Sequence, residues 1–103
     1  MNRLCEAGFR IVLRNFRCRA GELDIVARRS TLLVIAEVRL RTRSDYGGAG
    51  ASITRRKRLR IVTTARYLLH RRPALASLTI RFDTLLFDGP DGALEWIEDA
   101  FRA

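Results

Sequence analysis

The order of apolar and polar patterns in this sequence predicts an α/β fold with a central mixed β-sheet flanked by helices. Two short segments, 21–27 and 32–39, are rich in β-branched and aliphatic residues and are separated by a polar stretch. A long segment with helical spacing follows at 54–71, and a further strand pattern lies at 78–87. The expected order is therefore helix, three strands, helix and two strands (α-β-β-β-α-β-β).

Length and composition suit one small globular domain. The chain has 103 residues, of which 48% are hydrophobic, and we expect residues 1–103 to form a single domain. No apolar run approaches the roughly 18 residues of a membrane span, and no signal peptide is visible. We therefore expect a cytoplasmic protein with no membrane partner. Its only cysteines, Cys5 and Cys18, lack a CxxC spacing and are expected to be buried or half-buried thiols.

The chain is strongly basic, with a formal net charge of +9 and a pI of about 11.3. Only one of its 20 basic residues, Lys57, is a lysine. Arginine is suited to bidentate contact with phosphate. Coding bias explains the choice of arginine over lysine equally well, but it does not explain the net charge. The charge predicts an anionic partner: nucleic acid, an acidic membrane surface or an acidic protein.

The N-terminal part is expected to hold a short helix and one strand. Residues 2–7 have room for one or two helical turns, which Gly8 would end. Over residues 9–18 apolar residues alternate with Arg and Asn, with one lapse at Val12. Arg10 lies on the polar face of this strand, where it either contacts phosphate or is simply solvated.

The two central segments are expected to form an antiparallel hairpin whose centre follows Ser30. In that register Asp24 falls opposite Glu37, and Glu22 falls opposite Arg39. Because alternate side chains of a strand share a face, three carboxylates and one guanidinium would converge on one patch.

Such a patch has a chemical and a purely structural interpretation. Glu37 interrupts an apolar strand, where an ionised carboxylate is costly unless it is paired or holds a metal. Carboxylates in contact suit Mg²⁺, which takes oxygen ligands and keeps several waters. A cation there stabilises charge on a phosphate or orients an attacking water. Alternatively, Glu22 and Arg39 form an ordinary ion pair and Asp24 is only a strand-end acid.

The strand that carries Glu37 is almost continuously apolar over residues 32–38, which predicts an inner strand covered on both faces. Arg41 and Arg43 follow it as candidate phosphate contacts. Three glycines within residues 47–50 then predict a mobile loop, which either closes on a substrate or only connects two elements.

A helix is expected between an N-cap at Thr54 and about Arg71. Cations in its first turns oppose the helix dipole at a cost of a few tenths of a kcal/mol each. This predicts that Arg55, Lys57 and Arg58 contact nucleic acid, unless they form only a solvated basic face. Arg58 is expected to point to the sheet side, with Lys57 at its edge. The apolar stripe comprises Ile61, Val62, Ala65, Leu68 and Leu69, with Leu59 at its border.

The C-terminal part predicts a strand at 78–87, a turn at 88–92 and a short return strand at 94–97 on an edge of the sheet. Trp96 is expected to pack on the core rather than to stack on a base. The acidic residues 98–99 are not expected to contact DNA.

Gly-Glu-Leu-Asp at 21–24 and Glu-Val-Arg at 37–39 resemble the core of the restriction-endonuclease-like nucleases, the PD-(D/E)xK superfamily. More narrowly, the chain resembles the YraN family of small bacterial proteins, which are related in fold to archaeal Holliday-junction resolvases. Further fragments match this family in order and spacing: Gly8-Phe9-Arg10-Ile11, Tyr46-Gly47, Ile53-Thr54 with Lys57, Ala65-Arg66-Tyr67-Leu68 and Arg81-Phe82-Asp83.

The resemblance implies a restriction-endonuclease-like fold and a Mg²⁺-dependent, structure-selective DNA endonuclease, with Mn²⁺ as a substitute metal. Asp24, Glu37 and the Val38 carbonyl would hold the metal, and Glu22 would support them. Arg39 stands where the superfamily has a lysine, and a planar guanidinium is not equivalent to a compact ammonium. The alternative is therefore a non-catalytic nucleic-acid-binding module in which Arg39 forms a fixed salt bridge.

Partners follow from the same resemblance. It favours DNA over RNA as the partner. If the protein also acts as resolvases do, we expect a homodimer that presents two sites to two strands. A third interpretation is an adaptor whose basic helix docks an acidic protein.

Overall fold

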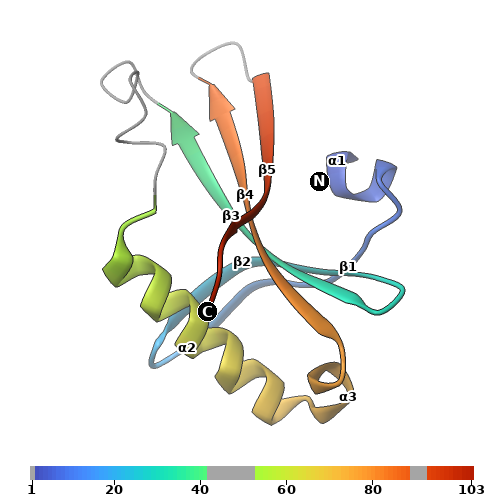
Figure 1. Ribbon diagram of the computed structural model, residues 1–103, viewed down its shortest axis with the longest axis vertical. Helices are drawn as coiled ribbons and strands as arrows, with labels where there is room; N and C mark the ends of the chain where they lie inside the picture. The colour runs from blue at the N-terminus through green and yellow to red at the C-terminus, as the bar shows by residue number, and fades with distance from the viewer. Residues whose placement is uncertain (1, 42–52, 89–92) are drawn as a thin grey trace.

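A computed structural model describes residues 2–41, 53–88 and 93–103 of the chain (Figure 1). The described elements follow the predicted order, with one short helix added before the fourth strand. They are α1 (Asn2–Glu6), β1 (Arg10–Cys18), β2 (Gly21–Arg29), β3 (Leu32–Arg41), α2 (Arg55–Arg71), α3 (Pro73–Ala76), β4 (Thr79–Asp88) and β5 (Ala93–Phe101). The predicted mixed α/β class is confirmed.

The five strands form one sheet in chain order, β1-β2-β3-β4-β5. Strands β3 and β4 are parallel, and the other neighbouring pairs are antiparallel, so the sheet is mixed as predicted. Parallel neighbours need a long crossover, and α2 lies in that connection, across one face of the sheet (Figure 1). The return strand β5 lies at an edge, as predicted, but it is longer than residues 94–97.

The predicted hairpin register is confirmed. Ile25 lies opposite Ala36, and Arg29 lies opposite Leu32. Ser30, which follows β2, has a φ of 53°, and such left-handed residues are typical of the tight turns that join antiparallel strands. The polar stretch between the two segments therefore sets the register without an Asn-Gly pair.

Two irregularities bend β1 where it pairs with β2. The register shifts between Ile11 and Leu13, which is the position of the lapse in alternation at Val12. Asn15 has a φ of 52°, a left-handed conformation that asparagine tolerates better than most residues. Leu13 and Phe16, three residues apart, consequently pack against the same core. The strand thus exchanges its faces at Asn15.

Apolar side chains cover both faces of the sheet. The core under α2 includes Leu23, Leu33, Ile35, Ile61, Val62, Ala65 and Leu68. The opposite face holds Leu4, Phe9, Ile25, Ala27, Val34, Ala36 and Leu85. All residues from Leu33 to Glu37 are buried, which confirms β3 as an inner strand. Leu59 is 57% exposed and does not belong to the helix stripe, so its predicted place at the border is wrong.

The predicted bounds of α2 are confirmed. Thr54 caps the helix, and its hydroxyl accepts a hydrogen bond from the Lys57 backbone N–H at 3.2 Å. The helix ends at Arg71, shortly before a proline that cannot continue it. Gly21 allows α2 to approach β2 closely, because a Cβ there would lie 3.1 Å from the Thr64 hydroxyl. The long helix is therefore fixed at its start and across β2.

Several smaller predictions have definite outcomes. Cys5 is exposed, contrary to prediction, and Cys18 is half-buried. Trp96 packs on the core as predicted, with its ring edge-on to Phe9 at 5.9 Å. No helix in the described part of the chain is long and apolar enough to cross a membrane. The predicted loop with Arg43 lies outside the described residues, as do residues 89–92 of the turn predicted at 88–92 and the side chain of Arg41.

Candidate functional site

Strands β2 and β3 separate at one end of their hairpin, and two carboxylates occupy the fork. The last paired residues are Ile25 and Ala36. Beyond them the Val38 N–H donates to Asp24 Oδ2 at 2.9 Å, and the Asp24 N–H donates more weakly to Glu37 Oε2 at 3.4 Å. Side-chain oxygens thus replace the ladder hydrogen bonds where the strands part, and Asp24 meets Glu37 as the register predicted. Figure 1 shows β3, β4 and β5 running away from β1 and β2 beyond this point.

Glu37 is an unusual carboxyl because it is only 3% exposed. Burial raises its pKa from the ordinary 4.5 to about 7, and the negative charge of Asp24 adds to this effect. The hydrogen bond from the Asp24 N–H and the charge of Lys57 act in the opposite direction. The Glu37 carboxyl therefore changes its protonation state near neutral pH, as groups at functional sites often do.

Helix α2 brings a single lysine toward this pair. Lys57 is half-buried in the first turn of α2, and its charge lowers the pKa of Glu37. Arg58, which was predicted to point to the sheet, is exposed, and so is Arg55. Lys57, at the start of α2, thus acts on Glu37, while Arg55 and Arg58 face solvent.

The other members of the predicted patch lie differently. Glu22 forms an ion pair with Arg17, its partner in the β1–β2 register. Arg39 is half-buried on β3, opposite Leu86 of β4. Within the described hairpin, the backbone pairing of β2 with β3 does not reach Glu22 and Arg39. The β2–β3 pairing ends at Ile25 and Ala36, so a continuous ladder does not predict where these two residues lie.

A hollow of about 410 Å³ opens beside the fork and is lined by Arg14, Asn15, Asp24, Ile25 and Val38. Arg14 is exposed, so a guanidinium stands near one of the two carboxylates. Sequence patterns place Arg14 on the polar face of β1 but do not distinguish it from Arg10. Arg10 lies opposite Arg28, toward the turn end of the hairpin and away from the fork.

The donor set at the fork suits a hard divalent cation. Asp24 and Glu37 supply carboxylate oxygens, and their mutual repulsion is relieved by positive charge. Among the residues that the structure describes, no group of three or more His, Cys, Asp or Glu side chains could hold a metal. Mg²⁺ is commonly held by one or two carboxylates with several waters. Asp24 and Glu37 supply the two carboxylates that such a site uses.

A second buried acid, Asp83 of β4, has a different role. Its side chain is fully buried and accepts hydrogen bonds from Arg81 Nε and Nη2, both at 2.8 Å, and from Trp96 Nε1 at 2.8 Å. The backbone N–H of Asp99 donates to it at 3.0 Å, and Arg81 also contacts Glu98 at 3.1 Å. With four donors directed at it, the Asp83 carboxylate ties β5 to β4.

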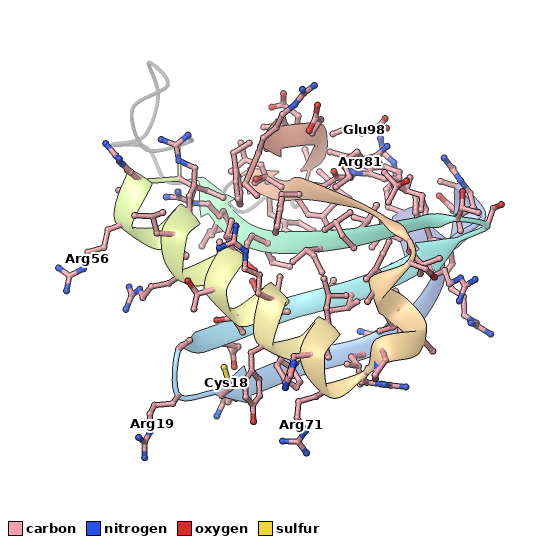
Figure 2. All side chains as sticks on the ribbon, turned by 60° about the horizontal axis from the view of Figure 1, so that its bottom comes forward. Cys18, Arg19, Arg56, Arg71, Arg81 and Glu98 are labelled. Atoms are coloured by element: carbon pink, nitrogen blue, oxygen red, sulfur yellow. The ribbon has the colours of Figure 1, made fainter. Side chains whose placement is uncertain are left out.

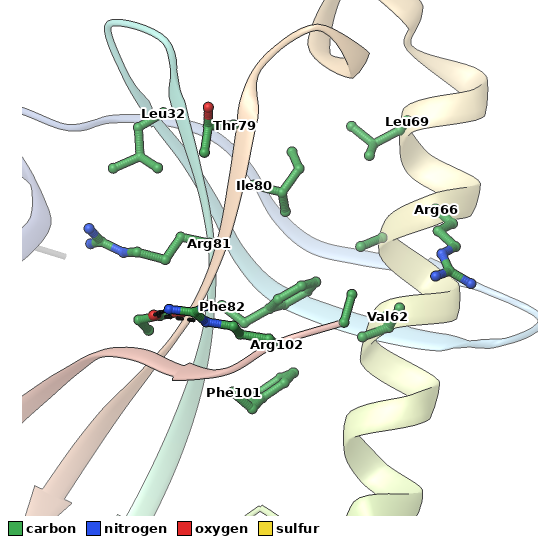
Figure 3. A pocket seen from close by; sticks show the side chains of 13 residues that line it. Leu32, Val62, Arg66, Leu69, Thr79, Ile80, Arg81, Phe82, Phe101 and Arg102 are labelled. Atoms are coloured by element: carbon green, nitrogen blue, oxygen red, sulfur yellow. Dashed lines mark hydrogen bonds and ion pairs between the residues drawn. The ribbon is translucent and has the colours of Figure 1, made fainter.

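A further hollow of about 520 Å³ lies between α2 and the strands β4 and β5, and none of its lining residues belongs to the fork (Figure 3). Apolar side chains such as Val62, Leu69 and Phe82 make up much of its wall. Arg66, on α2 in Figure 3, and Arg102 also line it. This hollow is separate from the carboxylate pair.

The fold and the fork define a small, basic, mixed α/β protein in which a buried carboxyl, Glu37, lies beside a half-buried one, Asp24. The chain belongs to the uncharacterised protein family UPF0102, whose model matches residues 1–87. It is 52% identical over 98 residues to a UPF0102 protein of Dechloromonas aromatica (strain RCB), covering 95% of this chain and 78% of the relative. A UPF0102 protein of Xanthomonas oryzae pv. oryzae (strain PXO99A) is 46% identical, with 95% and 80% covered. One of Methylobacillus flagellatus is 41% identical, with 97% and 87% covered.

Proposed function

We propose that this protein binds nucleic acid and hydrolyses phosphodiester bonds in branched DNA with Mg²⁺ at the fork of β2 and β3, on a restriction-endonuclease-like fold. The observation that carries the proposal is the contact between Asp24 and Glu37. One of these acids is almost fully buried with a pKa of about 7, and the other opens on a hollow beside Arg14. The net charge of +9 supplies the attraction for a polyanion.

The roles of the residues follow from their positions. Asp24, Glu37 and the Val38 carbonyl would hold the metal, which when bound acts as a Lewis acid toward a phosphate oxygen. Lys57 favours the ionised form of Glu37, the form that a metal ligand requires. Arg39, half-buried on β3, would offset charge on the scissile phosphate in place of a lysine.

Phosphates flanking this site would meet the exposed arginines of α2. Arg55 and Arg58 are exposed in the first turn, next to Lys57, and their placement at a helix N-terminus is unfavourable without an anionic partner. Affinity for DNA should therefore fall steeply as the salt concentration is raised, because each phosphate contact releases about one counterion.

The residue at position 39 favours a second candidate function, a nucleic-acid-binding module without catalysis. A guanidinium stays charged at every accessible pH and cannot take or give a proton as an ammonium can. In this alternative the carboxylate pair serves only to end the hairpin ladder, and DNA binding is the same in chelator as in Mg²⁺.

Cleavage assays separate the two candidates. Labelled branched, nicked, single-stranded and duplex DNA would be incubated with Mg²⁺, with Mn²⁺ or with chelator. We expect metal-dependent cutting of branched DNA that Asp24→Asn abolishes and Glu6→Gln, a matched change of an exposed acid on α1, leaves intact. Cutting that persists in Asp24→Asn or in chelator would refute the metal site.

The variant Arg39→Lys addresses the second candidate directly. Cutting by Arg39→Lys but not by the natural chain would show that the fork is competent and that Arg39 silences it. Salt-sensitive binding without cutting by either protein would establish the binding module instead.

A further inference from the structure

On one flank of α2, away from the fork, arginine side chains surround an exposed aromatic ring. Two hollows of about 400 and 490 Å³ lie between the end of β1 and α2, and Cys18, Arg19 and Tyr67 line both of them. None of the described residues that line these hollows is acidic. Figure 2 shows Arg19 and Arg71 projecting on the same side of the molecule, with Cys18 between them.

Tyr67 is held so that one part of its ring faces solvent. Tyr67 is 41% exposed, and its ring centroid lies 6.3 Å from that of Phe16 in a tilted arrangement. Arg71 Nη1 donates to the Tyr67 hydroxyl at 2.9 Å, and the Arg71 guanidinium lies 5.8 Å from the ring centroid. An exposed ring anchored in this way presents a flat surface at little further entropic cost.

The positive charge around this ring comes from two elements. Arg19 follows β1, while Arg71 and Arg72 lie at the end of α2, and all three are exposed. A basic residue at a helix C-terminus complements the dipole, which accounts for Arg71 but not for Arg19. Arg17 is already paired with Glu22, so Arg19, Arg71 and Arg72 provide the charge available to a ligand.

We propose that these hollows bind single-stranded nucleic acid, with a base stacked on Tyr67 and phosphates at Arg19, Arg71 and Arg72. Basic grooves that contain an exposed aromatic ring suit single strands, because every unpaired base offers a π-face while a duplex hides it. An acidic peptide would use the same charges but has no need of the ring.

The position of the hollows connects them to the fork. At the helical rise of 1.5 Å per residue, Tyr67 lies about 15 Å along α2 from Lys57. A single strand that leaves the fork along α2 would therefore reach Tyr67. This inference rests on the proposed binding of nucleic acid but does not depend on cleavage.

The test is the affinity for a labelled oligothymidylate of about six nucleotides, measured by fluorescence anisotropy in chelator. We expect Tyr67→Ala to weaken binding about 5- to 100-fold, and Tyr67→Phe, which keeps the ring, to retain most of the affinity. Arg71→Ala should weaken binding and reduce the salt slope by about one. Arg66→Ala is the matched control, because Arg66 is also an exposed arginine of α2 but lines the hollow on the opposite flank.

Three outcomes would overturn the inference. These are equal losses in Arg71→Ala and Arg66→Ala, unchanged binding in Tyr67→Ala, and tighter binding of polyglutamate than of the oligonucleotide. Cleavage data keep the two proposals apart. If binding depends on Tyr67 but the protein cuts no DNA, only the endonuclease proposal is refuted. If the protein cuts DNA but Tyr67→Ala leaves its oligonucleotide affinity unchanged, only this inference is refuted.

Discussion

Glu37 should make the stability of the protein fall as the pH rises from about 4.5 to about 7. In the folded chain its pKa is raised from 4.5 to about 7, mainly by burial and then by the charge of Asp24. Below pH 4.5 the carboxyl is neutral in both the folded and the unfolded chain. As the pH rises further, the unfolded chain releases this proton first, so the folded state loses stability until the folded pKa is passed.

The size of the effect follows from the pKa difference. Each unit of pKa corresponds to about 1.4 kcal/mol, so a rise from 4.5 to about 7 lowers the free energy of unfolding by about 3 kcal/mol above pH 7. This is a large part of the roughly 5–15 kcal/mol that stabilises a small domain. Glu37→Gln removes the titration and keeps a side-chain oxygen that can accept from the Asp24 N–H.

Urea unfolding, followed by the fluorescence of the single Trp96, measures the difference. At pH 4.5 the natural chain and Glu37→Gln should be about equally stable, while at pH 8 the variant should be more stable by about 3 kcal/mol. Equal pH dependence in the two proteins would refute the buried, proton-binding state of Glu37.

Magnesium should act on the same titration. Because the proposed metal would bind Asp24 and ionised Glu37 in the folded chain only, Mg²⁺ should stabilise the natural chain at pH 8 and leave Glu37→Gln almost unchanged. An identical response of both proteins would contradict the assignment of the cation to the fork.

Two further predictions concern the parts of the fold that hold the site. Asp83→Asn should lower the free energy of unfolding by about 3 kcal/mol, because Arg81 loses its buried ionic partner. Asp99→Asn, which changes the exposed pair with Arg102, should change the free energy of unfolding by less than about 1 kcal/mol. Equal losses in the two variants would show that burial of Asp83 is unimportant. Thr54→Ala should cost about 1 kcal/mol through loss of the helix cap, whereas Thr54→Ser should retain most of the stability; thermal unfolding measures both, and an unchanged melting temperature in Thr54→Ala would contradict the cap.

Most of the fold could be predicted from local patterns. The alternation of apolar residues located the strands, and the short polar turn after Arg29 set the register that brought Asp24 beside Glu37. Thr54 and the proline after Arg72 delimited α2. These signals act over a few residues each, and the buried faces of the sheet reinforce them because a slip of one residue would expose the core.

The site was predicted less completely because its geometry depends on departures from regular structure. A continuous ladder would place Glu22 opposite Arg39, but β2 pairs with β3 only from Ile25 onward. Glu22 instead pairs with Arg17 on β1. Asn15 of β1 adopts a left-handed conformation. Asparagine tolerates that conformation, so its place in a strand pattern was one local signal of irregularity in β1.

The irregularity and the chemistry of the fork have a common cause. Where β2 and β3 separate, the backbone N–H groups of Asp24 and Val38 cannot donate to carbonyls of the neighbouring strand of the hairpin and need other acceptors. Carboxylates satisfy them, and the core that encloses β3 keeps Glu37 from water, which raises its pKa. A regular ladder would provide neither the spare donors nor the opening beside Asp24. The arrangement that ends the hairpin therefore also places a carboxyl with a pKa of about 7, that of Glu37, beside a second acid, Asp24.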